Sequence, residues 1–335
     1  MATLTDDRWG IKREVTYGVP VTVDRFYPWL EVEGMWDVRR RQAQGLAGGG
    51  GRRTVLGNRS FLPLGQGAVT TKVELESKGG GVLFDLAFGA STVNAITGGS
   101  QQVFHDAITS ALLPSATIQI VKVQNNGTEW VETYAGCTAG KVTIEQPEDD
   151  IATIEVEWDA RSVSTVTAAA MATYPASTTI YDHSQAAAGL GGSMTVPTTT
   201  ALATGPTTFA DFREFSVTLE QNIDTERWVL GGRTQPIAGI PTLKFEGKAE
   251  FNATTVPLAV INGTRMPFMC TWTTTEVVGA GFAQMQLAIP QLAFTGDLPK
   301  VEAGQTRIMD LKADIVNDGT NKDLYLVQRT ADVAL

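Results

Sequence analysis

Residues 141–159 read KVTIEQPEDDIATIEVEWD, and this stretch has the pattern of a β-hairpin. In the first strand, Val142 and Ile144 alternate with polar neighbours, which is the two-residue period of a strand with one dry face. The return strand repeats the alternation, with Ile154, Val156 and Trp158 on its dry face. QPEDD has the composition of a turn. We therefore expect a hairpin with one buried face and one polar face.

The polar side of this hairpin is rich in acids. The nineteen residues of the whole hairpin, turn included, hold seven carboxylates against one lysine: Glu145, Glu148, Asp149, Asp150, Glu155, Glu157 and Asp159. Like charges placed opposite each other destabilise a strand pair, and ordinary protein surfaces mix both signs. A plain solvated β-face is the simplest interpretation. The lack of interspersed bases favours a surface that faces something, with Glu145, Glu155, Glu157 and Asp159 on one side.

The strand pattern extends outward from the hairpin in both directions. Residues 69–76 and 215–220 alternate, and so do residues 243–251. The polar sides of these segments carry weaker candidates for the same acidic surface, namely Glu74, Glu76, Glu246 and Glu250. Leu83, Leu86 and Ala87 have the spacing of a short helix, and a buried strand is the alternative there. We expect a mainly β protein with a small helix.

Composition divides the 335-residue chain into parts. Residues 1–60 carry ten Lys and Arg against seven Asp and Glu, whereas the whole chain has a net charge of −10. Residues 38–58 contain four consecutive glycines flanked by arginines, which predicts a long basic loop. We divide the chain into a first β domain (1–163), an Ala/Thr/Gly-rich linker (164–208) and a second β domain or half (209–335).

Catalytic and metal-binding patterns are weak in this sequence. His105 and His183 lack metal-site spacing, and with only Cys137 and Cys270 no zinc set can be assembled. Residues 136–142, GCTAGKV, depart from a phosphate-binding loop. The acids leave two alternatives open: a carbohydrate-active β-enzyme that uses two carboxylates, and calcium binding at the 149–150 turn. We expect no enzyme activity, no cofactor and no metal.

Four stretches in order along the chain resemble the tail tube, or major tail, proteins of long non-contractile-tailed bacteriophages, in the form common among phages of actinobacteria. They are YGVPVTVDRFYPWLEVEG (17–34), HDAITSALLPSATIQIVKV followed by YAGCTAGKVTIE (105–145), FSVTLEQNIDTERWVLGG (215–232) and TGDLPKVEAGQTRIMDLKADIV (295–316). None of the four is a catalytic signature. Together they span some 300 residues.

The resemblance implies a fold and an assembly. The fold is a β-sandwich or barrel with a small flanking helix, with two related halves in this chain. Subunits form rings, either trimers with pseudo-sixfold symmetry or hexamers, whose inner strands make one continuous barrel. The rings stack into a tail tube, cap against tip and terminator proteins, and enclose the tape measure protein and then genomic DNA without specific binding. Assembly takes place in the host cytoplasm, and the product is the virion tail.

Physical chemistry assigns roles to the charged segments within that assembly. An acidic lining repels DNA phosphates, so DNA slides without deep binding wells. Glu145, Glu155, Glu157, Asp159, Glu74 and Glu76 are the lumen-facing candidates. The candidate contacts between rings are the loop arginines Arg39, Arg40, Arg41, Arg52 and Arg53. Rival classes are a capsid decoration protein or β-rich adhesin, which would give discrete particles in place of filaments.

Overall fold

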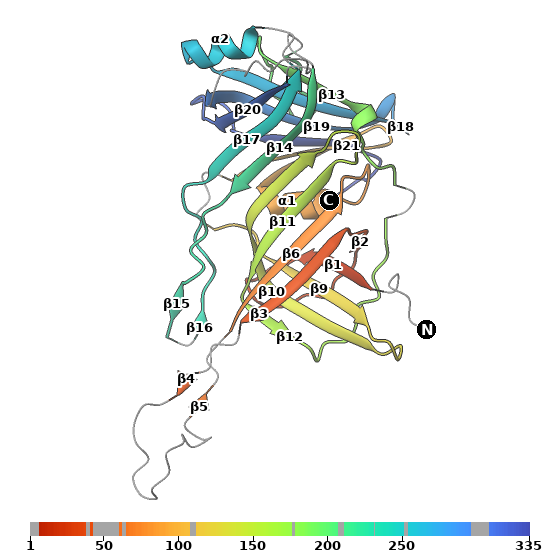
Figure 1. Cartoon of the computed structure of the whole chain (residues 1–335). Coiled ribbons are helices and arrows are strands. Elements are labelled where there is room, and N and C mark those ends of the chain that lie inside the picture. The colour runs from red at the N-terminus through yellow and green to blue at the C-terminus, as the bar shows by residue number, and fades with distance from the viewer. Residues whose placement is uncertain are drawn as a thin grey trace, which may run out of the picture.

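Strands dominate the molecule and arrange themselves around one long antiparallel sheet (Figure 1). A computed structural model describes residues 7–37, 41–42, 60–61, 65–107, 112–175, 178–206, 211–230, 232–250, 254–295 and 308–335. Within these ranges the regular structure is strands plus the short helices α1 (Gly81–Phe88) and α2 (Thr255–Asn262) and one 3₁₀ turn, His183–Gln185. The mainly β fold class is confirmed.

The central sheet is antiparallel throughout, and its strands come from both ends of the chain. In spatial order it consists of β3 (Glu31–Asp37), β6 (Gln66–Glu74), β11 (Thr153–Ala160), β10 (Glu129–Gln146), β14 (Phe212–Glu220), β17 (Thr242–Glu250), β20 (Ile308–Ile315) and the last residues of β19 (Gly281–Thr295). The predicted hairpin is therefore β10 paired with β11, with Val142 opposite Val156.

The remaining strands form two smaller layers that extend from β10 and β19. The first half of β19 pairs with β18 (Met266–Val278) and β21 (Tyr325–Thr330), flanked by β13 (Ala186–Leu190), β8 (Gly99–Asp106) and β7 (Gly89–Ile96). The first half of β10 pairs with β9 (Ala116–Val123) and β12 (Ser162–Ser164), next to β1 (Arg8–Arg13) and β2 (Phe26–Tyr27). Among the described strands, no pairing closes the sheets into a barrel.

The same pairing pattern occurs twice along the central sheet. The order β3, β6, β11, β10 is followed by β14, β17, β20, β19. In both sets a helix follows the second strand, and the long fourth strand also pairs with the strand before it, β9 or β18. The connection from β3 to β6 contains β4 (Arg41–Gln42) and β5 (Ser60–Phe61). The connection from β14 to β17 contains β15 (Trp228–Val229) and β16 (Gly232–Arg233). This repetition is what two related halves would produce.

The core lies behind the central sheet, because alternate residues of all its strands point to one side. Phe215, Phe245 and Phe268 form an aromatic cluster there, with ring centroids of Phe245 and Phe268 4.7 Å apart. The indole of Trp158 donates to the Thr71 hydroxyl, and that of Trp272 donates to the Gln146 side chain at 2.7 Å. The indole nitrogens of both tryptophans are thus hydrogen-bonded, and the bond from Trp272 joins β18 to the central sheet.

Two segments bear on the sequence predictions. The helix expected near residues 83–87 is α1, almost wholly buried, which confirms that prediction. Residues 164–208 contain β13, which pairs with β18, and their Tyr181 and Leu190 are buried. Much of the expected linker is therefore built into the fold, and the proposed domain limits stay a prediction.

Candidate functional site: the polar face

The outward side of the central sheet forms one continuous surface, the polar face. It consists of the outward-pointing residues of β3, β6, β11, β10, β14, β17 and β20. The opposite side of the same strands carries the buried apolar residues, so alternation alone places the charged side chains outside. The lysines of the face are Lys72, Lys141, Lys244, Lys248 and Lys312. Its carboxylates are Glu31, Glu33, Asp37, Glu74, Glu145, Glu155, Glu157, Glu214, Glu220, Glu246, Glu250, Asp310 and Asp314.

Lysines from neighbouring strands lie between the acids of the hairpin. Lys72 of β6 approaches both Glu145 and Glu155, at 3.4 and 3.9 Å. Lys141 lies 2.7 Å from Glu157, directly across the β10–β11 pair, and this hydrogen bond raises the pKa of the lysine. The one-signed pattern seen in the sequence therefore becomes a mixed surface once the sheet forms. It stays acidic overall, because carboxylates outnumber lysines by more than two to one.

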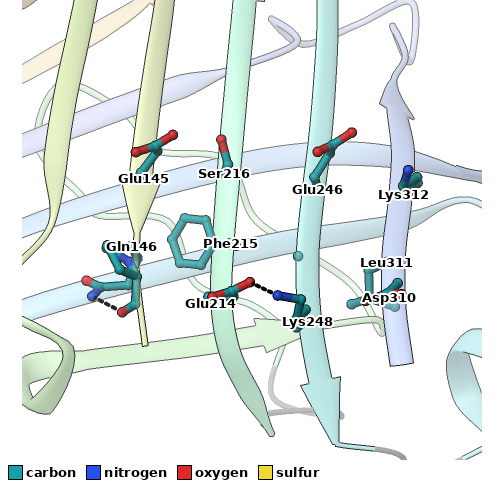
Figure 2. A pocket seen from close by; sticks show the side chains of 12 residues that line it. Glu145, Gln146, Glu214, Phe215, Ser216, Glu246, Lys248, Asp310, Leu311 and Lys312 are labelled. Carbon is teal, nitrogen blue, oxygen red and sulfur yellow. Dashed lines mark hydrogen bonds and ion pairs between the residues drawn. The ribbon is translucent and has the colours of Figure 1, made fainter. Parts of the chain in front are cut away.

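Figure 2 shows how the charges follow one another across the second half of the face. Glu145, Ser216, Glu246 and Lys312 stand in one row on β10, β14, β17 and β20. In the next row, Lys248 pairs with Glu214 at 2.6 Å. These side chains line a hollow that is open to solvent. Its lining mixes carboxylates with the lysines Lys248 and Lys312, which suits a wetted surface better than a pocket for one ligand.

Asp159 differs from the other lumen-facing candidates because it is buried, with 8% of its surface exposed. Its carboxylate accepts a hydrogen bond from Arg233 of β16 at 2.5 Å and one from Gln66 at 3.3 Å. Burial raises the pKa of Asp159, and the hydrogen bond from Arg233 opposes that shift. Its local role is thus to hold Arg233, and it adds little to the exposed charge of the face.

Glu74 and Glu76 lie at the far end of β6. Glu74 stands opposite Thr153 at the rim of the polar face. Glu76 is half-buried beyond the end of the strand, where it bridges to Ile180, and burial raises the pKa of its carboxyl. Glu250, a weaker candidate, pairs with Arg213 at 2.8 Å.

The predicted basic loop falls mostly outside the described residues. Arg41 belongs to the short strand β4, which pairs with β5. The other candidate arginines, Arg39, Arg40, Arg52 and Arg53, lie outside the described residues. β4 and β5 lie beyond the end of the sheet where β3 ends and β6 begins (Figure 1).

Metal binding, reactive cysteines and membrane-spanning helices were also considered in the described part of the chain. Within it, no group of three or more His, Cys, Asp and Glu side chains is placed to hold a metal ion. Cys137 and Cys270 are fully buried, and burial raises the pKa of both thiols well above the usual value. In the same residues, no helix has the length and apolar character needed to span a membrane.

The fold is that of a mainly β protein whose long central sheet carries one charged face. The chain matches the family model described as phage tail tube protein over residues 8–303. The match spans most of the sequence, so the chain belongs to the phage tail tube protein family. It is a structural protein of a bacteriophage virion, and its family implies a tail component that assembles with itself and with other tail proteins. No curated protein matches the chain.

Proposed function

We propose that this chain polymerises into stacked rings that form the tail tube, with the polar face lining the channel through which DNA leaves the virion. The observation that carries the proposal is the continuous polar face, which spans eight strands if the end of β19 is included. A tube needs an uninterrupted wall of this kind. Its other side is already filled by the chain's own core and smaller layers.

The width of the sheet favours three chains in a ring. Strands lie about 4.8 Å apart and tilt by about 40° in a barrel. Three chains with eight strands each then give a backbone diameter of about 48 Å, and side chains narrow the opening to about 35 Å. Six chains give a backbone diameter of about 95 Å. DNA is roughly 20 Å wide, so the smaller ring confines it and the larger one does not.

The edges of the sheet support closure into a ring. Among the described strands, β3 pairs with β6 alone, so one edge of its backbone has no strand beside it. At the opposite end, β19 covers β20 only over residues 312–315. Exposed strand edges promote association, and a closed ring removes them. We propose that these two edges meet between neighbouring copies.

The charge of the polar face suits passage of DNA. The acids outnumber the lysines, so the lining repels phosphates, and the interspersed lysines keep neighbouring carboxylates from destabilising the wall. In this proposal Glu145, Glu155 and Glu157 face the lumen, with Glu74 at its rim. Glu76 and Asp159 belong to the candidate set but contribute less, because both are shielded.

The other proposed contacts follow from the same assembly. The arginines of residues 38–58 are proposed to meet carboxylates of the next ring. The tape measure protein and then DNA would occupy the lumen without specific binding, and tip and terminator proteins would cap the ends. Assembly is proposed to take place in the host cytoplasm. We also propose that the chain acts without catalysis, because the acids of the polar face lie on an open wall and several are ion-paired with lysines.

Native mass spectrometry of the purified protein, joined to negative-stain microscopy, tests this function. We expect rings with three times the 35.8 kDa chain mass, and tubes at high concentration or with a tail-tip initiator. A ring of six chains would refute the ring size. Discrete particles under every condition would instead favour a decoration protein or adhesin.

A further inference from the structure

The smaller layer around β19 has a far side that points away from the main core. Along β19, Met285 and Leu287 pack into the core, so alternation turns Gln286 to the opposite side of the layer. Gln286 is nevertheless only 2% exposed. On β8 and β21, Val103 and Val327 lie directly opposite each other on that far side and are buried as well. A further part of the chain must therefore cover the far side.

The cover is a flap, residues 194–204, which belongs to the Ala/Thr/Gly-rich segment. Its backbone folds back on itself, because Thr195 and Thr204 exchange two hydrogen bonds, at 2.8 and 3.1 Å. Its apolar side chains pack on the far side of the layer: Met194, Val196, Leu202 and Ala203. The flap carries no charge, and its exposed residues are threonines and one alanine. It therefore replaces an apolar surface by a neutral, wettable one.

Gln286 holds the flap by its backbone. The side-chain oxygen accepts a hydrogen bond from the Ala203 nitrogen at 2.7 Å, and the side-chain nitrogen donates to the Ala203 oxygen at 3.1 Å. The same nitrogen donates to the hydroxyl of Thr271, directly across the β18–β19 pair. Gln101, which is fully buried, donates to the backbone oxygen of Thr198 at 2.8 Å. The flap is thus fixed at two points along its length.

The first half of the chain uses the same device. On β9, Gln119 donates to the backbone oxygen of Ala168 at 3.1 Å and accepts from the nitrogen of Ala170 at 2.7 Å. It also donates to the hydroxyl of Thr133, directly across the β9–β10 pair. In both halves a buried glutamine beside a threonine clamps an uncharged segment, and both segments come from residues 164–208. This region therefore covers the two smaller layers as well as connecting the halves.

We infer that the flap conceals a self-association face and thereby keeps the outside of one tube from adhering to another. With the polar face on the channel, the far side of the β19 layer lies on the outside, so the inference rests on the proposed tube. Without the flap, Val103, Val327 and Tyr325 would form an apolar patch across β8 and β21. Exposed patches of this kind promote association. Because every copy carries the same patch, weak contacts would add up along two neighbouring tubes.

Removal of the flap tests the inference. Thr195 and Thr204 are paired, so Gly-Gly in place of residues 196–203 can close the chain as a tight hairpin. Below the concentration at which tubes form, sedimentation velocity of this flapless chain should show at least tenfold more material larger than one ring. Its tubes should lie side by side in bundles on negative-stain grids. Circular dichroism checks that the flapless chain is folded.

Two point variants test the clamp in the full-length chain. Gln286→Leu removes both hydrogen bonds to Ala203 and should let thermolysin cut within residues 194–204 at least tenfold faster. Gln284→Leu is the matched control, because Gln284 lies on the same side of β19 and bonds to Thr273 of β18. Its cleavage rate should equal that of the unmodified chain. Equal rates in the two variants would show that Gln286 does not hold the flap.

A charged pair on the uncovered patch completes the test. Val103→Lys with Val327→Glu in the flapless chain should return association to the level of the unmodified chain, because the two charges attract across the strands and keep the patch wet. The inference is overturned if the flapless chain associates no more than the unmodified one, or if the charged pair leaves its association unchanged. If the unmodified chain forms no tubes, the proposed function fails, whereas larger species from the flapless chain would still support a concealed face.

Discussion

At the scale of single residues, Asp159 shows best what a sequence pattern omits. Alternation with Val156 and Trp158 assigns it to the polar side, together with Glu155 and Glu157. Arg233, far away in the chain, then covers it and converts a surface acid into half of a buried ion pair. A buried ion pair contributes little net stability to the fold, because both charges lose their hydration on burial. Removing only one of the two side chains is costly, because the other charge is then left buried without a partner.

Arg233→Met should therefore destabilise the protein by about 3–5 kcal/mol, because it leaves Asp159 charged and buried without its partner. Chemical denaturation of the purified, unassembled chain measures this loss of stability. Lys141→Met, which breaks the exposed pair with Glu157, is the matched control and should cost at most about 1 kcal/mol. Equal losses in the two variants would contradict the difference in burial.

Asp106 gives the protein a pH dependence of stability. It is 1% exposed, and burial raises the pKa of its carboxyl. The folded state then takes up the proton at a higher pH than the unfolded state, so this group favours folding increasingly as the pH falls from neutral toward the carboxyl range. Asp106→Asn should remove that gain. Denaturation of both proteins at about pH 7 and about pH 5 tests this; an unchanged difference between the two pH values would count against it.

At the scale of elements, the strands with a two-residue period could be predicted from the sequence, but which strands lie side by side in the sheet could not. The dry and wet sides of β10 and β11 follow from alternation within nineteen residues. Lys72 reaches Glu145 and Glu155 only because β6 pairs with β11, a contact between segments more than seventy residues apart. The sequence therefore predicted the carboxylates and missed their lysine partners.

Helix α2 and the β15–β16 pair show a different reason for failure. Residues 255–262, TVPLAVIN, contain Thr, Val, Ile and Pro, which are weak helix formers, so no helix was expected there. The helix forms because Val256 and Ala259 pack on the core. Residues 215–220 were predicted as a strand from their alternation, whereas residues 221–232 were singled out only by the family resemblance. Nothing local indicated that Arg233 would be buried.

The aromatic cluster is the contact that holds the second half together. Phe268 of β18 packs on Phe215 of β14 and Phe245 of β17, which joins the smaller layer to the central sheet. Phe268→Ala should cost about 3–5 kcal/mol through the cavity it leaves. Phe268→Leu keeps most of the volume and should cost clearly less. Thermal unfolding of both variants checks this order, and a reversed order would show that the cluster is not tightly packed.

At the scale of the whole molecule, the sheet is a wall whose charge pattern emerges only when its strands are side by side. The net acidity of the polar face depends on residues that lie far from the hairpin in the sequence, including Glu220 of β14, Glu246 of β17 and Asp310 of β20. DNA in the proposed channel would therefore meet the charge of the complete face and not that of one pair of strands.

Reversing that charge should slow the passage of DNA. Phage carrying Glu220→Lys, Glu246→Lys and Asp310→Lys together should assemble tails yet eject DNA at least tenfold more slowly at low salt. Ejection should recover as salt rises, because each phosphate contact weakens with counterion concentration. The same three positions changed to Gln serve as the control, with a smaller effect. Ejection at the normal rate in the lysine variant would show that these side chains do not meet DNA.

A cryo-electron microscopy map of the polymerised protein would show directly which way the polar face points within an assembled tube. We expect three chains in each ring, with Glu145, Glu155, Glu157 and the lysines Lys72 and Lys141 on the wall of the channel. A map in which the polar face lies on the outer surface of the tube, or is covered by another domain, would contradict this expectation.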